Sequence, residues 1–536
     1  MKQRKQRRER LSIYLAKDGA AEDGTILKTE DALPAIVLNT SGAVVRLFVK
    51  RERPGAPPPW TALFSSRPEV PDGTFGVTRT VGAALTVRRN GRTFVLTFGS
   101  GFHLLNTESI ERDFGLRVAL NSVEPSKLRS VDKASYDHNP LNSRTQSTTD
   151  VDIFDLNTDS ELDMLYAVTG VSRVPLFGSH VTGRDALTLM VETGLDGFAS
   201  ILDEAIERYT SKLPAEFEWI DNVRKVKDTE TIEILDLLLN DALCDSAQST
   251  VWLGEPEMVD WEGQLGYSFD MYANTARHVV LQLKDLIDHL EKKGRDLTVE
   301  TLKATWVHVN NNDYQLVRAW SAYRCTYAEV SDGDDRFLLR SGIWYQVSAD
   351  FVKTVDAYLS GLHSYAYEFP VYSYSDEGDY NAAVAKEDKA ICLMDKKNTK
   401  IGGQYDKIEF CDLIRNKTDL IHVKFYRSSG TLSHLFAQGY VAAEAFIKDD
   451  DFRQELNSKL PVSVRLNDAA ARPNASKYCV VYAIATSKKL PDELPFFSKV
   501  TLRNALRTLR ALGYDVKLSA IDVDPALLAT KKFKPH

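Results

Sequence analysis

Residues 402–426 read GGQYDKIEFCDLIRNKTDLIHVKFY and carry the most specific arrangement of side chains in the chain. A glycine turn leads into an apolar strand that ends at Asp412, and the polar residues 415–419 then reverse the chain. The next strand presents His422 and Lys424 on one face, because strand side chains alternate. A hairpin with Asp412 on that face would bring three polar groups together beside a sheet. Because each has a large desolvation cost without partners, we interpret the three as a functional cluster.

The sequence around this hairpin predicts an α/β domain over residues 336–536. Apolar runs bounded by turn residues predict the strands, and Gly513 is typical of a helix end. The expected order from Asp376 onward is helix, three strands, helix, strand, helix and strand. This order predicts one mixed sheet with helices packed on its faces.

Two further regions are expected upstream, which makes the predicted fold class α+β with several domains. Residues 1–150 read as short strands separated by turns, with a strong hairpin signal at Asn90-Gly91. The polar stretch 132–150 is predicted to be a mobile loop or a boundary. Residues 151–335 are predicted to be mainly helical, because their leucines recur at helical spacing.

The composition places the chain among globular proteins, since 43% of its 536 residues are hydrophobic and 26% are charged. No run of about 18 apolar residues occurs, so no transmembrane helix is expected. The basic start MKQRKQRRER leads into no apolar segment, which argues against a signal peptide and predicts a cytoplasmic protein. Five cysteines without a CxxC pair predict reduced thiols. The net charge of −8 argues against binding nucleic acid by bulk charge and leaves local basic patches open.

The spacing of Asp412, His422 and Lys424 resembles that of the PD-(D/E)XK, or restriction-endonuclease-like, nuclease superfamily. The resemblance covers about residues 370–525 and includes the order of helices and strands. It implies that Asp412 is a ligand of Mg²⁺ or Mn²⁺ and that Lys424 positions the attacking water or the phosphate. It also implies supporting roles for Glu377, on the helix before the three strands, and for Gln438, on the helix after them.

One position departs from that superfamily, because His422 stands where an acidic metal ligand is expected. Imidazole suits manganese, iron or zinc better than magnesium. A neighbouring carboxylate could substitute, and the sequence offers Asp395, Glu409 and Glu444. Glu409 is three residues from Asp412 on one expected strand, so alternation predicts the opposite face for it and favours the other two. The expected metal ligands are therefore Asp412, His422, Asp395 and Glu444.

A simpler reading of the same residues stays open. Asp412 and Lys424 could form an ordinary cross-strand ion pair, and His422 could be a core histidine. The protein would then be a non-catalytic module that binds nucleic acid or a partner through a degenerate nuclease-like fold.

The predicted helix 498–512 carries basic residues at helical spacing. Arg503 and Arg507 are one turn apart and Arg510 follows, with Lys499 near the helix start. Two interpretations remain for these four residues. They form either a solvated helix face or a face that follows nucleic-acid phosphates.

Over the whole chain, the sequence resembles a sporadically distributed family of bacterial proteins of unknown function that is carried by mobile elements and defence islands. The segments that carry the resemblance are TFGSG (97–101), ERDFGLR (111–117), GIWY (342–345), IHVK (421–424) and LSHLFAQG (432–439). It implies an anti-phage or mobile-element defence protein that acts on DNA or RNA. Metal-dependent phosphodiester hydrolysis is the expected mechanism, and the non-catalytic module is the alternative.

Overall fold

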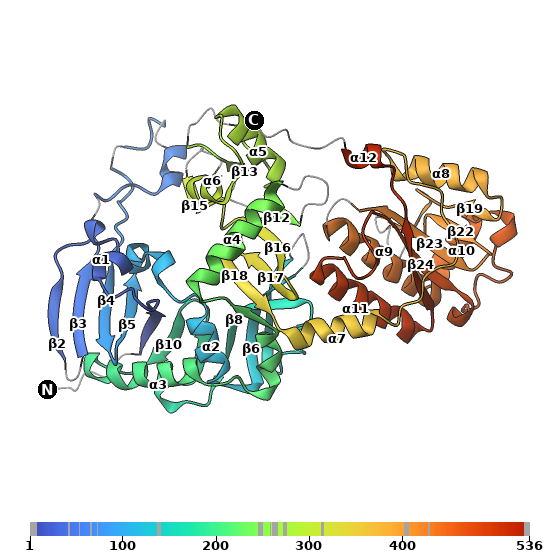
Figure 1. Ribbon diagram of the computed structural model, residues 1–536. Coiled ribbons are helices and arrows are strands. Elements are labelled where there is room, and N and C mark those ends of the chain that lie inside the picture. The colour runs from blue at the N-terminus through green and yellow to red at the C-terminus, as the bar shows by residue number, and fades with distance from the viewer. Residues whose placement is uncertain are drawn as a thin grey trace. The chain divides into compact units, whose positions relative to one another are not determined.

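The computed structural model divides into two compact units, Met1–Ala134 with Ser143–Ile220, and Ser135–Asn142 with Asp221–His536. Each unit is described by itself, and Figure 1 labels the elements. The structure describes residues 8–40, 43–52, 54–64, 67–71, 73–136, 141–244, 250–257, 259, 266–271, 276–311, 316–400, 407–426 and 429–529.

The first unit is built on a ten-stranded sheet with the order β2-β3-β4-β5-β1-β10-β9-β8-β6-β7. Its strands are β1 (Glu9–Leu15), β2 (Ile36–Thr40), β3 (Ala43–Val49), β4 (Gly82–Arg89), β5 (Arg92–Gly99), β6 (Val123–Ser135), β7 (Asn142–Val151), β8 (Asp163–Ser172), β9 (His180–Gly183) and β10 (Leu187–Val191). Asn90 and Gly91 join β4 to β5 with φ of 50° and 74°, which confirms the predicted hairpin.

Helices α2 (Phe114–Leu120) and α3 (Phe198–Thr210) pack on this sheet and share its buried core. The contact between α2 and β9 is close, because a Cβ atom on Gly183 would overlap the carbonyl oxygen of Gly115. Glycine is therefore required there for the helix to approach the strand.

The polar stretch 132–150 contains a boundary between the two units, since Ser135–Asn142 belong to the second unit, but its described residues do not form the expected loop. Residues 137–140 lie outside the described residues. The described part of the stretch forms the end of β6 and most of β7. β7 is the last strand of the sheet order and is largely exposed, so its residues can be polar without breaking the sheet. Consequently the first unit continues to Ile220 and does not end near residue 150.

The second unit begins with a five-stranded sheet of order β11-β18-β17-β16-β12 and a three-stranded sheet of order β13-β14-β15. Their strands are β11 (Val223–Lys225), β12 (Val251–Leu253), β13 (Gly266–Ser268), β14 (Trp306–Asn310), β15 (Leu316–Ser321), β16 (Thr326–Asp332), β17 (Asp335–Arg340) and β18 (Ile343–Val347). The accompanying helices are α4 (Thr229–Cys244), α5 (Leu283–Lys292), α6 (Val299–Ala304) and α7 (Ala349–Leu359).

The region 151–335 therefore mixes strands and helices, and the mainly helical prediction was too simple. The predicted helical stripes of α4 and α5 do face the core, where Leu235, Leu239, Leu286 and Leu290 are buried. Among the missed strands, β11, β12 and β13 have three residues each, and an alternation of period two cannot be recognised over so short a run. The longer strands β8, β10, β14, β15 and β16 were also missed, and run length does not explain these.

The C-terminal part of the second unit contains a mixed five-stranded sheet of order β19-β22-β23-β24-β25. Strands β19 (Ile391–Leu393), β22 (Leu413–Arg415) and β23 (Asp419–Phe425) are antiparallel to one another, and β24 (Cys479–Ala485) and β25 (Asp515–Ile521) continue parallel to β23. A separate ribbon pairs β20 (Asn398–Lys400) with β21 (Lys407–Glu409). The predicted mixed sheet and the neighbouring positions of β22 and β23 are confirmed.

Helices cover both faces of this sheet (Figure 1). On one face, Tyr380 and Val384 of α8 (Glu377–Glu387) pack with Val423 and Val481. On the other face, the Tyr482 hydroxyl donates to the Phe436 carbonyl of α9 (Ser429–Lys448) at 3.0 Å. Further helices near the sheet are α10 (Asp450–Lys459), α11 (Phe496–Leu512) and the short α12 (Pro525–Ala529), whose Leu527 packs on the same core. α11 ends at Gly513 with φ of 95°, as predicted.

Among the described residues, no helix is both long and apolar enough to cross a membrane. The five cysteines are free thiols, of which Cys325, Cys411 and Cys479 are buried and Cys244 is exposed.

Candidate functional site

Asp412 is fixed by backbone hydrogen bonds on both sides, just before β22 begins. Its N–H donates to the Ile421 carbonyl of β23 at 3.0 Å, and its carbonyl accepts the N–H groups of Met394 and Asp395 at 2.8 and 3.0 Å. Its carboxylate accepts the Val423 N–H at 2.6 Å. These bonds hold Asp395 directly against Asp412 and leave one oxygen of the Asp412 carboxylate for another partner.

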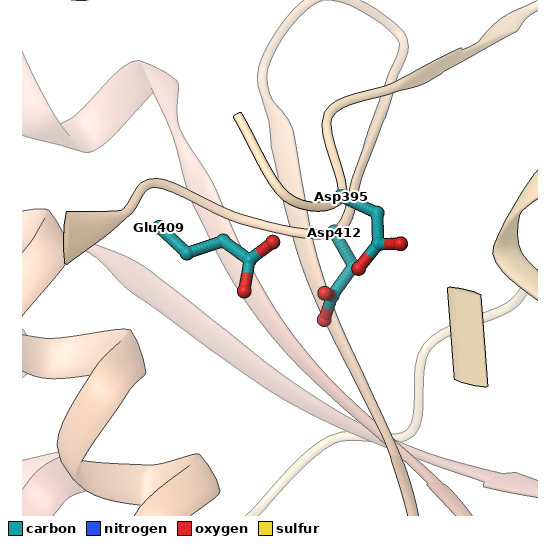
Figure 2. Close-up of side chains that lie close together, drawn as sticks. All are labelled: Asp395, Glu409 and Asp412. Atoms are coloured by element: carbon teal, nitrogen blue, oxygen red, sulfur yellow. The ribbon is translucent and has the colours of Figure 1, made fainter. Parts of the chain in front are cut away.

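Three carboxylates meet at this point. Asp395 follows β19, Glu409 is the last residue of β21, and one oxygen from each of these side chains and from Asp412 lies within 4.8 Å of the others. Figure 2 shows the three side chains converging from separate segments of the chain. We call Asp395, Glu409 and Asp412 the carboxylate group.

The position of Glu409 corrects the expectation that it lies on the opposite face from Asp412. Residues 407–414 are not one strand, because β21 pairs with β20 outside the main sheet and the chain passes through the buried Phe410 and Cys411 before β22. The alternation that placed Glu409 away from Asp412 is interrupted between the two residues. The Lys396 N–H donates to the Glu409 carboxylate and fixes its direction.

Burial raises the pKa of all three members of the carboxylate group. For Asp412 the pKa lies well above its ordinary value, chiefly because of desolvation, with the Val423 N–H acting against this and the charges of Glu409 and Asp395 adding to it. Desolvation is also the first cause of the raised pKa values of Glu409 and Asp395. In the described part of the chain, the group has a single ion pair, 4.0 Å from Lys396 Nζ to Asp395 Oδ2. The negative charge of the group is therefore poorly compensated by the chain itself.

Lys424 and Glu377 lie beside the group and bind each other. The Lys424 ammonium donates to one oxygen of Glu377 at 2.7 Å, and the Phe425 N–H donates to the other oxygen at 3.1 Å. Glu377 is the first residue of α8, so the start of this helix is tied to the end of β23. The positive charge of Lys424 offsets part of the rise in the pKa of Glu409. Lys424 is therefore within electrostatic reach of the carboxylate group.

His422 is a core residue of the sheet and does not belong to the carboxylate group. Its side chain is 4% exposed, and its ring centroid lies 6.0 Å from that of Tyr482 on the neighbouring strand. Burial lowers the pKa of His422 to about 4, so the imidazole is neutral at physiological pH. This placement agrees with the simpler reading of His422 and not with its expected place among the metal ligands.

The other expected site residues lie on helices. Gln438 is half-buried on α9, and Glu444, further along the same helix, pairs with Lys448 at 2.5 Å. Neither is part of the carboxylate group found among the described residues. Of the four expected metal ligands, the structure thus brings Asp395 to Asp412 and leaves His422 and Glu444 outside the group.

The four basic residues of α11 do not form one exposed face. Lys499 is 7% exposed and pairs with Asp356 of α7 at 2.8 Å, and Arg503 is 9% exposed. Arg503 and Arg510 both lie over the ring of Tyr358, also on α7. Only Arg507 and Arg510 of the four are exposed, so a role of this helix in phosphate binding stays a prediction for these two residues.

Two residues of α8 complete the surroundings of the group and carry no recognisable sequence signal. A Cβ atom on Gly378 would lie 2.7 Å from Asp395 Oδ2, so glycine lets the helix start approach this carboxylate. Asn381 is fully buried beside Asp395 and counteracts the rise in its pKa. Neither polar atom of the Asn381 side chain reaches ordinary hydrogen-bond geometry with a described residue.

The fold and the site define a mixed α+β protein with a group of carboxylates at the edge of a mixed sheet. The chain belongs to DUF6119, a family of unknown function, whose family model matches residues 11–522. A search of curated proteins found no match, and a search of solved structures also found none.

Proposed function

We propose that this protein is a metal-dependent phosphodiesterase that acts on nucleic acid, with the carboxylate group as its Mg²⁺ or Mn²⁺ site. The observation that carries the proposal is the convergence of Asp395, Glu409 and Asp412, whose nearest oxygens lie within 4.8 Å of one another. Hard divalent cations prefer such oxygen ligands, and Mg²⁺ in particular binds through a few carboxylates together with water and phosphate oxygens.

The immediate surroundings fit a cation. The Glu409 and Asp412 carboxylates each accept one backbone N–H, from Lys396 and Val423, which orients them. Their raised pKa values reflect uncompensated burial of negative charge, and a divalent cation would remove that cost. The buried Asn381 carboxamide lies next to Asp395 and counteracts the rise in its pKa, which favours the charged form that a cation needs.

The roles of the chain's own residues follow from their contacts. Asp395, Glu409 and Asp412 would hold the metal, which supplies charge stabilisation for the transferring phosphoryl group. Lys424 presents an ammonium within electrostatic reach of Glu409 and would position the attacking water or a phosphate oxygen. Glu377 fixes the direction of Lys424 through their 2.7 Å ion pair. His422 would take no part, because it is buried away from the group.

The order of elements supports the same proposal. α8, the antiparallel strands β19, β22 and β23 of the main sheet, helix α9 and the parallel strand β24 occur along the chain in the order that the nuclease resemblance implies, with the β20–β21 ribbon inserted after β19 and α10 inserted after α9. The superfamily has an acidic ligand where this chain has His422. In the proposed site, Glu409 would supply that carboxylate instead. In its biological setting, we propose a role in bacterial anti-phage or mobile-element defence, as the whole-chain resemblance implies.

The test is cleavage of single- and double-stranded DNA and RNA by the purified full chain with Mg²⁺ or Mn²⁺ and with a chelator. Asp412→Asn should abolish cleavage and Mn²⁺ binding by calorimetry. Glu444→Gln is the matched control, because this exposed carboxylate already pairs with Lys448 and lies outside the group. Metal binding without cleavage of any substrate would favour the non-catalytic module, and absence of metal binding would overturn the site itself.

A further inference from the structure

Lys488 lies just beyond the strand next to the one that carries Lys424. β23 and β24 are parallel, so their carboxyl ends lie at the same edge of the sheet. The ladder continues beyond β23, because the Tyr426 N–H donates to the Ala485 carbonyl at 3.0 Å. Lys488 follows Ala485 by three residues.

The ammonium of Lys488 lies over the ring of Tyr426, the residue directly after β23. The Lys488 Nζ atom lies 5.8 Å from the centroid of the Tyr426 ring, within the range of a cation–π interaction. Since the Tyr426 side chain is 2% exposed, this ring is a fixed support for the ammonium.

The charge of Lys488 has no ionic partner in the part of the chain that the structure describes. By contrast, its neighbour Lys489 pairs with Asp492 at 3.4 Å, and Lys424 pairs with Glu377 at 2.7 Å. The backbone of Lys488 is anchored, since its N–H donates to Thr486 Oγ1 at 3.1 Å. The turn after β24 therefore holds an uncompensated cation in a defined place.

We propose that Lys488 binds a backbone phosphate next to the one that is cleaved, so that the substrate is a polynucleotide strand. This inference rests on the proposed function of the carboxylate group. A polyanion that approaches three carboxylates is repelled unless cations lie along its path, and Lys424 and Lys488, at the carboxyl ends of neighbouring parallel strands, supply two. Lysine suits this task as a point charge for phosphate. A small phosphodiester has no second phosphate and would not use Lys488.

The test compares two substrates of the full chain with Mn²⁺, a single-stranded 20-nucleotide oligonucleotide and bis(p-nitrophenyl) phosphate. Lys488→Gln should raise KM for the oligonucleotide roughly 10-fold, as expected for loss of one charge-assisted hydrogen bond, with kcat nearly unchanged. It should leave both constants for the small phosphodiester unchanged, and Lys488→Arg should restore the oligonucleotide KM. Lys489→Gln is the matched control, because Lys489 is already paired.

A binding measurement keeps this inference separate from the proposed function. In fluorescence anisotropy of the labelled oligonucleotide, the slope of log K against log salt concentration should fall by about 1 in Lys488→Gln and not in Lys489→Gln. This result without cleavage would support the phosphate contact and count against the phosphodiesterase. Cleavage with an unchanged KM and slope in Lys488→Gln, an equal KM change for both substrates, or no binding of the oligonucleotide would overturn the inference.

Discussion

Two sites with buried carboxylates in this protein differ in how their negative charge is compensated. One is Asp163 with Lys133, and the other is the carboxylate group. In the first unit, Lys133 of β6 donates to Asp163 Oδ2 at 2.6 Å and to the Asn157 carbonyl. The same Asp163 oxygen accepts the Asp159 N–H at 2.9 Å. In the second unit, the carboxylate group has only the 4.0 Å contact of Asp395 with Lys396 in the described part of the chain.

We interpret Asp163 as a structural carboxylate and the carboxylate group as a functional one. The Lys133 group carries its own cation, with the Lys133 and Asp163 side chains 11% and 12% exposed. The carboxylate group has raised pKa values, and among the described residues no cation contacts it more closely than Lys396 at 4.0 Å from Asp395. The number of acidic residues in the sequence does not reveal which site is functional. Residues 150–163 are richer in acids than residues 395–412, yet only the latter contain the carboxylate group.

The largest expected change in stability follows from removing Lys133, the cation that compensates Asp163. Lys133→Met should destabilise the full chain by about 3 kcal/mol, because it leaves Asp163 charged and buried without its partner. Urea unfolding would measure the loss, and hydrogen exchange should show it first in the amides of β6 and β8. Arg129→Met is the matched control on the same strand. Its ion pair with Asp150 is 37% and 39% exposed and should contribute less than about 1 kcal/mol. Equal effects of the two substitutions would contradict the comparison.

A third carboxylate, Glu329, is half-buried and has backbone N–H partners at the start of α11. Its raised pKa predicts that stability depends on pH. Glu329 of β16 faces the start of α11, where the Phe497 N–H donates to it at 3.4 Å, and burial raises its pKa to about 7 from an ordinary 4.5. The folded state then binds the proton more tightly than the unfolded state. Stability should be greatest below pH 4.5 as far as this group is concerned, and should fall as the pH rises to 7 and beyond.

Glu329→Gln should remove that dependence, because glutamine keeps an oxygen for the N–H groups and cannot ionise. At pH 8 the variant should be more stable than the wild type by on the order of 2 kcal/mol, and the difference should shrink toward pH 5. Urea midpoints across this pH range would measure it. A variant that is less stable than the wild type at pH 8 would show that the charge of Glu329 stabilises the helix start more than burial penalises it.

The sequence predicted the C-terminal sheet better than the site that it supports. The apolar runs of β23 and β24 and the helix end at Gly513 carry strong local signals, and one mixed sheet was predicted from them, without the β20–β21 ribbon or α10. Asp395 and Asp412 were both expected at the site. Glu409 was named as a candidate but expected on the opposite face, because an isolated three-residue strand interrupts the alternation and no local pattern reveals this. Asn381 and Gly378 were missed because their roles depend on where α8 meets Asp395, a contact between segments distant along the chain.

Removal of one charge from the carboxylate group should change the free energy of unfolding less than Lys133→Met does, and in the opposite direction. Without metal, Asp412→Asn should leave the free energy of unfolding unchanged or raise it by up to about 1 kcal/mol. The amide oxygen can still accept the Val423 N–H, and the repulsion by Glu409 and Asp395 disappears. Thermal unfolding with and without Mn²⁺ would measure it, and the stabilisation by Mn²⁺ seen in the wild type should be absent. Destabilisation of the metal-free variant by several kcal/mol would place Asp412 with Asp163 as a structural carboxylate.

The smallest expected change in stability belongs to Lys424. Its ion pair with Glu377 has side chains 23% and 26% exposed, and Lys424→Ala should shift the free energy of unfolding by less than about 1 kcal/mol. The same substitution should abolish metal-dependent cleavage, because the ammonium near Glu409 is the residue placed to position water or phosphate. Mn²⁺ binding should persist, since the three carboxylates remain. If Lys424→Ala instead unfolded the domain while Asp412→Asn left it stable, the Lys424–Glu377 pair would be the structural joint between α8 and β23, and the cation for the chemistry would have to be sought elsewhere on this face.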